Sequence, residues 1–311
     1  MKLFSFFKKN YLGLICIALT FSICAYVLCF GLKKARNYEV IHKLAKEQTI
    51  YSIWHVETFE GGGKARINYL KNIARTMEKQ DTSSLFMIKS VDAENLENEL
   101  KNSQPDIISF GFGVGKVVLS FLKEQNKTFD VRDELVSSGS FNKKFYAVPY
   151  MVSGYAMFNH SMQSTEFHVG ANAFVKPDNI YSKLNLTPKG NETQYEAYKS
   201  FIYDKKVQLL GTGRDLFRIS NLNSIGRTNA IITPIDTYTD LIQYLGIINP
   251  NKTTQEFLSL ALNNINQNSL IDYSLFSSKY NKLYNTGIYS DMEDAIFMCL
   301  IPNVFVEPQH F

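Results

Sequence analysis

The feature that most constrains this chain is a regular alternation of extended and helical segments between residues 49 and 125. Apolar, β-branched runs at Thr49–Val56, Leu85–Val91 and Asp106–Phe110 alternate with helical patterns at 64–79, after Asp92 and at 116–125. In the first helix, apolar residues recur at three- and four-residue spacing. Strands and helices that alternate in this way form right-handed βαβ units. The sequence therefore predicts an α/β fold with a parallel sheet.

The second half of the soluble part is less regular. A long aromatic run at Phe145–Phe158 is broken by Pro149 and Gly154, which predicts two extended pieces. Further on we expect a helix at 194–203, strands at 207–210 and 230–235, and two helices that open with the capping pairs Thr253/Glu256 and Ser290/Glu293. No internal repeat is visible.

The N-terminal region differs in composition from the rest. Residues 11–31 contain no charged side chain and are flanked by Lys8 and Lys9 on one side and by Lys33, Lys34 and Arg36 on the other. A helix of this length crosses a hydrocarbon core about 30 Å thick. The run is long for a cleaved signal peptide and lacks small residues at its end. We expect residues 1–36 to form one transmembrane helix, with a cleaved signal as the alternative.

Two glycine-rich segments follow predicted strands. Residues 57–64 read Glu-Thr-Phe-Glu-Gly-Gly-Gly-Lys, and residues 111–115 read Gly-Phe-Gly-Val-Gly. Neither has the spacing of a nucleotide-binding loop. Each lies where the carboxyl end of a strand meets a helix, which is where α/β sheets bind ligands. A ligand-lining loop and a plain turn remain open for both.

Several classes of function lack support in the sequence. The formal net charge is +4, and charges of both signs are interspersed, so we expect no nucleic-acid partner. The five histidines and four cysteines show no metal-ligand spacing, and we expect neither a metal nor a cofactor. Glu57 and Glu60 lie on one loop, unlike a glycosidase pair that flanks its substrate. No catalytic motif is present, and we expect that the protein is not an enzyme.

Seven segments of the chain carry a family resemblance through their order and spacing, although no single one is specific. They are Ile53–His55 with Glu60–Arg66, Gln104–Gly111, Tyr146–Tyr150 with Met157–Asn159, Gly211–Arg218, and Tyr238–Leu245. Together they resemble family 1 extracellular solute-binding proteins of ABC importers, the carbohydrate-binding type. The resemblance covers residues 50–305. It implies a two-lobed, periplasmic-binding-protein-like fold of type II in which hinge closure traps a solute.

The resemblance implies a division of this chain into lobes. Lobe one comprises residues 37–149 and 240–311, a shortened lobe two comprises residues 150–239, and the crossings fall near Pro149 and Tyr238. The resemblance also implies a small-molecule solute, expected to be a sugar, and ABC permease subunits as partners. The soluble part is expected outside the cell membrane, held there by a single-pass helix. The alternative is a membrane-anchored sensory or interaction protein on a degenerate scaffold.

The resemblance and the strand ends together give a set of residues that we expect to line the cleft between the lobes. They are Trp54, Glu57, Glu60, Gly61, Gly62, Ser109, Gly111, Gly113, Tyr150, Arg214 and Tyr238.

Overall fold

The computed structural model describes residues 19–26, 28, 48–56, 58, 65–125, 129–160, 166–169, 194–204, 207–269 and 276–306. Two compact units are distinguished, one of residues 1–49 and 82–84 and the other of residues 50–81 and 85–311. Residues 19–26 of the first unit are helical. Among the described residues, no helix is both long and apolar enough to cross a membrane. Most of residues 11–31 lie outside the described residues, so the transmembrane helix stays a prediction.

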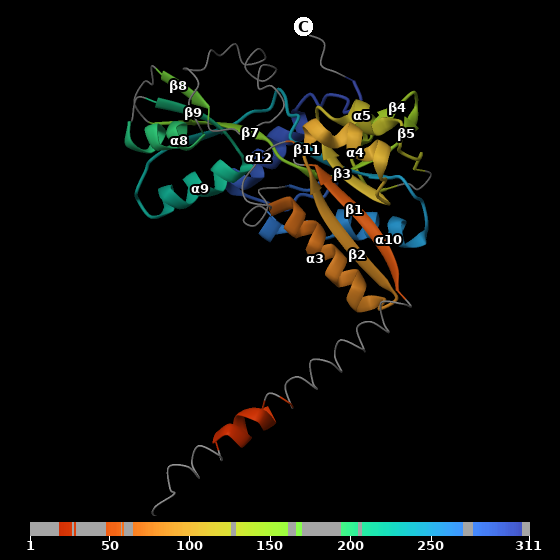
Figure 1. The fold of residues 1–311 in the computed structure, drawn as a ribbon. Coiled ribbons are helices and arrows are strands. Elements are labelled where there is room, and N and C mark those ends of the chain that lie inside the picture. Colours follow the sequence, from red (N-terminus) through yellow and green to blue (C-terminus); the bar gives the residue numbers. More distant parts are fainter. Residues whose placement is uncertain are drawn as a thin grey trace, which may run out of the picture. The chain divides into compact units, whose positions relative to one another are not determined.

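The larger unit contains a five-stranded mixed sheet (Figure 1). Its strands are arranged in the order β2-β1-β3-β11-β6. β1 and β3 are parallel, whereas β11 is antiparallel to both β3 and β6. The α/β class and the expected parallel pairing of β1 with β3 are confirmed, whereas the antiparallel β11, which returns from the other sheet, was not predicted. The bounds are β1 Thr49–Val56, β2 Ser84–Val91, β3 Ile107–Gly111, β6 Ala147–Val152 and β11 Ile242–Ile247.

Helices cover both faces of this sheet. On one face, α3 (Ala65–Gln80) and α10 (Lys252–Asn263) pack together, and Tyr69 of α3 donates a hydrogen bond to the carbonyl of Ala261. On the other face, Tyr244 of β11 bonds Ser138 of α6 (Asp133–Ser138) at 2.8 Å. The result is a three-layer α/β/α arrangement. The remaining small elements are η1 (Ala93–Asn95), α4 (Leu96–Asn102), α5 (Gly115–Leu119), β4 (Ser140–Phe141) and β5 (Lys144–Phe145).

A second sheet has four strands in the order β10-β7-β9-β8. Helices α8 and α9 pack beside it, and Phe201 of α8 contacts Phe158 of β7 with ring centroids 6.4 Å apart. The last helix, α12, ends at Met298. The bounds are β7 Tyr155–Asn159, β8 Glu166–Val169, β9 Val207–Thr212, β10 Ile231–Pro234, α8 Gln194–Tyr203, α9 Gly213–Ser224 and α12 Gly287–Met298.

The chain changes sheets at two neighbouring segments. β6 of the first sheet ends at Val152 and β7 of the second begins at Tyr155, so the change lies a few residues beyond Pro149. The return segment lies alongside, because Ser153 N–H donates to the Leu241 carbonyl at 2.7 Å and Tyr155 Oη donates to Asp240 Oδ1 at 2.7 Å. Two sheets joined by paired crossings fit the expected two lobes, and the division into lobes stays a prediction.

The sequence patterns predicted the presence of helices and strands better than the residues at which they begin and end. The two extended pieces within 145–158 and the helix at 194–203 are confirmed. The predicted caps are wrong: Asn251 and Thr254 form the capping box of α10, and α12 begins after Thr286. The helix expected at 116–125 ends at Leu119, after which Leu122 fills the space beside Gly246.

Candidate functional site

The carboxyl ends of β1 and β3 define one edge of the five-stranded sheet. β11 runs in the opposite direction, so its first residues lie at the same edge, as do the last residues of β6. His55 pairs in register with Ser109, and Gln243 with Gly111, which places these side chains on one face of the sheet. We call His55, Ser109, Tyr150 and Gln243 the edge cluster.

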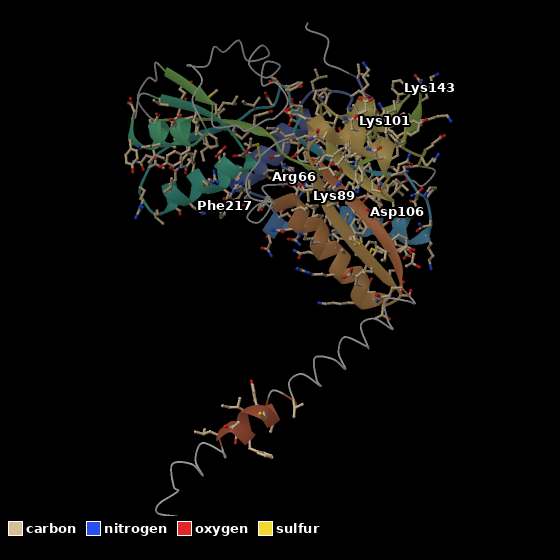
Figure 2. The ribbon with its side chains drawn as sticks, in the orientation of Figure 1. Arg66, Lys89, Lys101, Asp106, Lys143 and Phe217 are labelled. Atoms are coloured by element: carbon tan, nitrogen blue, oxygen red, sulfur yellow. The ribbon has the colours of Figure 1, made fainter. Side chains whose placement is uncertain are left out.

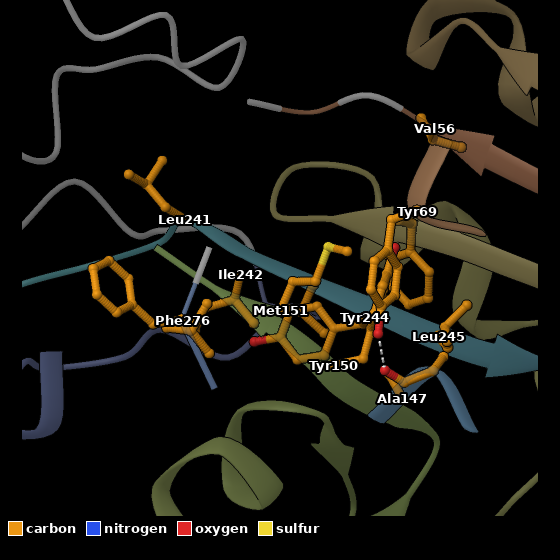
Figure 3. Close-up of a cluster of buried hydrophobic side chains, with 14 of the residues drawn as sticks. Val56, Tyr69, Ala147, Tyr150, Met151, Leu241, Ile242, Tyr244, Leu245 and Phe276 are labelled. Atoms are coloured by element: carbon orange, nitrogen blue, oxygen red, sulfur yellow. Dashed lines mark hydrogen bonds between the residues drawn. The ribbon is translucent and has the colours of Figure 1, made fainter. Parts of the chain in front are cut away.

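The edge cluster is a connected hydrogen-bond network centred on Ser109. Ser109 Oγ lies 2.9 Å from His55 Nδ1, 2.9 Å from Tyr150 Oη and 3.0 Å from Gln243 Nε2. Gln243 Nε2 also donates to the Val56 carbonyl at 3.1 Å. All four residues are fully buried. Tyr150 packs on Tyr69 of α3, with ring centroids 6.0 Å apart (Figure 3).

The donors and acceptors of this network leave two arrangements for its protons. Ser109 Oγ accepts from the amide of Gln243, so it has one proton and one further lone pair for its other two neighbours. Either His55 Nδ1–H donates to Ser109 and Ser109 donates to Tyr150, or Tyr150 donates to Ser109 and Ser109 donates to His55. His55 Nε2 is therefore an acceptor in the first arrangement and a donor in the second.

The edge cluster is electrically neutral near neutral pH. Burial, together with the nearby Arg66 cation, lowers the pKa of His55 from 6.5 to about 3. Burial also raises the pKa of Tyr150 above its usual value, although the bond to Ser109 opposes this. The imidazole is thus uncharged and the phenol keeps its proton.

Three enclosed polar atoms in and beside the edge cluster have no hydrogen-bond partner among the described residues. They are His55 Nε2, Gln243 Oε1 and Thr58 Oγ1. Buried polar groups in native proteins are nearly always paired. Thr58 lies against Gly111, where an added Cβ would overlap its hydroxyl. The close approach of these chain segments requires glycine at 111, a reason that sequence spacing did not reveal.

The structure brings only some of the predicted cleft residues together. Ser109 and Tyr150 bond directly, and Gly111 lies beside them. Trp54 is buried on the opposite face of β1 from His55, with Lys89 Nζ of β2 4.8 Å from its ring centroid (Lys89 is labelled in Figure 2). Four further predicted residues lie outside the described residues, and their role stays a prediction; they are Glu57, Glu60, Gly61 and Gly62.

Three other predicted residues lie away from the edge cluster. Gly113 is in the turn after β3, with φ of 96°. Tyr238 is buried in the return crossing and bonds Asp240 Oδ2 at 3.3 Å. Arg214 is in the first turn of α9, where its backbone N–H donates a hydrogen bond to Thr212 Oγ1. The Asp215 carboxylate forms its ion pair with Arg218 rather than with Arg214.

Sequence reasoning missed His55, Thr58 and Gln243. Strand alternation shows that Trp54 and His55 face opposite sides, but it does not show which side lies in the cluster. Gln243 carried a readable signal, because it is a single polar side chain within the apolar strand Ile-Gln-Tyr-Leu-Gly-Ile. A fully buried amide in such a strand needs polar neighbours.

Comparison with known proteins gives structural matches only. No family model matches the sequence, and no curated protein matches it. The GacH receptor of Streptomyces glaucescens, solved unliganded and with acarbose, matches with a TM-score of 0.57 and 11% identity over 82% of this chain and 88% of that one. The galacto-N-biose-/lacto-N-biose I-binding protein of the ABC transporter from Bifidobacterium longum matches with a TM-score of 0.51 and 11% identity, covering 80% and 82%.

An extracellular solute-binding protein of family 1 from Alicyclobacillus acidocaldarius matches as well, with a TM-score of 0.50 and 9% identity over 85% of this chain and 89% of that one. Identities this low carry the fold and not the ligand. The matches span most of both chains. This chain has the fold of the extracellular solute-binding proteins of ABC transporters.

Proposed function

We propose that the protein binds a carbohydrate solute outside the cytoplasmic membrane for an ABC-type importer. The fold supports this function, and so do the sugars named with its structural neighbours, acarbose and lacto-N-biose among them. Binding would take place at the carboxyl edge of the five-stranded sheet, with hinge closure at the paired crossings. The permease subunits would be its partners.

The edge cluster is the observation that carries this proposal. Its four side chains are polar and uncharged at neutral pH, and the three unpartnered atoms include both donor and acceptor capacity. Neutral donors and acceptors at a strand edge suit sugar hydroxyl groups, which both donate and accept. The four side chains carry no charge at neutral pH, and the Arg66 cation lies near His55 and Tyr150.

The Ser109–His55 pair resembles the nucleophile and base of a hydrolase, but two observations favour binding. A general base works best with a pKa near the operating pH, and that of His55 is about 3. Gln243 donates a hydrogen bond into Ser109 Oγ and so occupies one of its lone pairs.

A thermal-shift screen of neutral oligosaccharides tests this function. A bound sugar at about one hundred times its Kd should stabilise the protein by about 2.7 kcal/mol, which raises the melting temperature by roughly 5 °C. Ser109→Ala should reduce that ligand-induced shift, whereas Ser224→Ala, at the exposed end of α9, should keep it. If no sugar shifts the wild-type melting temperature, the proposal fails and the sensory or interaction role takes its place.

Membrane attachment through residues 1–36 is the second part of the proposal. It is supported by the uncharged stretch at 11–31 and by the exposed apolar side chains of Leu19, Phe21, Ile23 and Tyr26 in its helical portion. Protease added to intact cells should remove the soluble part while the anchor stays with the membrane. Survival of the soluble part until lysis would contradict this topology, and a mature chain beginning near residue 32 would identify a cleaved signal.

A further inference from the structure

Arg132 is a buried cation that the edge cluster does not use. It immediately precedes α6, and only 2% of its surface is exposed. Within the described residues, neither a hydrogen bond nor an ion pair joins its guanidinium to an acceptor, and its Nε is enclosed without a partner. The Phe297 ring of α12 lies with its centroid 4.0 Å from the guanidinium carbon. A guanidinium is costly to bury without an anion, because it loses its hydration.

Ser278 adjoins the backbone of Arg132, and its hydroxyl also lacks a hydrogen-bond partner among the described residues. The backbone N–H of Arg132 donates a hydrogen bond to the Ser278 carbonyl at 3.1 Å, so the two residues are held together by their backbones. The Ser278 side chain is fully buried, and its Oγ has no partner in the described part of the chain. Arg132 Nε and Ser278 Oγ thus both lack partners and belong to residues that are bonded through their backbones, which leaves donors available for an acceptor group.

The groups around Arg132 compensate its positive charge only in part. Burial lowers the pKa of Arg132 to about 10, and the Glu134 and Glu293 carboxylates and the groups of Tyr280 and Cys299 only partly oppose this. In the described part of the chain, neither carboxylate forms an ion pair with the guanidinium. Glu293 instead accepts hydrogen bonds at 2.8 Å from two backbone N–H groups of the loop before α12, which commits both of its oxygens elsewhere.

We propose that Arg132 and Ser278 form a binding site for an oxyanion, either a carboxylate borne by a solute or a free inorganic oxyanion. The planar guanidinium presents paired N–H groups that match two oxygens of such a group, while Phe297 supports one face. The Ser278 hydroxyl donates a further bond. This site is separate from the neutral edge cluster, and it does not depend on the carbohydrate proposal.

Melting temperatures of the full-length protein test this site. Sodium phosphate, sodium sulfate and sodium glucuronate are titrated separately at constant ionic strength, set with sodium chloride. At least one oxyanion should raise the wild-type melting temperature saturably. Arg132→Gln should abolish that rise and, without oxyanion, should melt at or above the wild-type temperature, because it removes an unpaired buried charge. Arg227→Gln, at an exposed arginine, should retain the rise and so controls for general ion effects.

The three probes distinguish the source of the anion. A larger shift with glucuronate identifies a solute carboxylate, and a larger shift with phosphate or sulfate identifies an inorganic ligand. Arg132→Lys keeps the positive charge but loses the paired N–H donors of the planar guanidinium, and it should raise the apparent Kd of the oxyanion about tenfold or more. The proposal is overturned if no probe shifts the wild-type protein, or if Arg132→Gln leaves the shift intact. Loss of sugar binding alone would overturn the carbohydrate proposal and not this one.

Discussion

Replacing His55 with asparagine is expected to remove a loss of stability that the wild-type protein shows in mild acid. The pKa of His55 is about 3 in the folded protein and about 6.5 when unfolded. Below about pH 6.5 the unfolded chain binds a proton that the folded chain does not, so stability falls as the pH falls. At pH 4.5 the loss relative to neutral pH should be roughly 2–3 kcal/mol. The asparagine amide of the His55→Asn variant cannot titrate, and it can still bond Ser109 from the position of Nδ1.

The measurement is the free energy of unfolding in urea at about pH 7 and about pH 4.5 for both proteins. Three other buried carboxyl groups titrate with the opposite sign, and burial raises the pKa of one of them, Glu293. Burial raises the pKa of Asp215 to about 6 and also raises that of Asp240, so each favours folding at lower pH. Both proteins contain these carboxyl groups. Their contributions therefore cancel when the change in unfolding free energy between the two pH values is compared between wild type and His55→Asn. Equal pH dependence in the two proteins would show that His55 is not buried as a neutral side chain.

Truncation of Tyr150 should destabilise the protein far more than removal of its hydroxyl alone. The ring is fully buried against Tyr69, within the core drawn in Figure 3. Tyr150→Ala leaves a cavity and should cost about 3–5 kcal/mol, as buried aromatic truncations do. Tyr150→Phe keeps the ring, loses the bond to Ser109 and should cost about 1–2 kcal/mol.

Urea unfolding of the two variants checks this difference. Because Tyr150 is fully buried, alanine at this position removes the ring packing together with the bond to Ser109, so a loss of binding in that variant would not report on the hydroxyl alone. Tyr150→Phe is therefore the variant to use in binding experiments. Equal costs for alanine and phenylalanine would mean that the ring makes no core contact, contrary to its position.

The existence of the main strands and helices was predictable because periodicity records which side chains face the core. The direction of β11 was not, since an apolar strand such as Ile242–Ile247 reads the same in parallel and antiparallel pairing. The caps were misplaced because Asn251, Thr253 and Thr254 all suit a helix start, and only backbone geometry selects one.

The candidate site was predictable in position but not in composition. Strand order and the carboxyl-edge rule indicated Ser109, Gly111 and Tyr150. The partners His55 and Gln243 come from strands 54 and 134 residues away in sequence from Ser109, and no local pattern links them. Arg132 was missed for a related reason, because its burial depends on a ring contact with the C-terminal helix α12.

Isothermal titration calorimetry of the full-length protein with neutral oligosaccharides tests the account most directly. We expect saturable binding of one sugar per chain, with a Kd of about 1 μM, which corresponds to a binding free energy of about −8 kcal/mol. Tyr150→Phe should shift the titration to higher sugar concentration, because it disturbs the network around Ser109. A folded wild-type protein that gives no heat of binding with any sugar of the panel would contradict carbohydrate binding at the edge cluster.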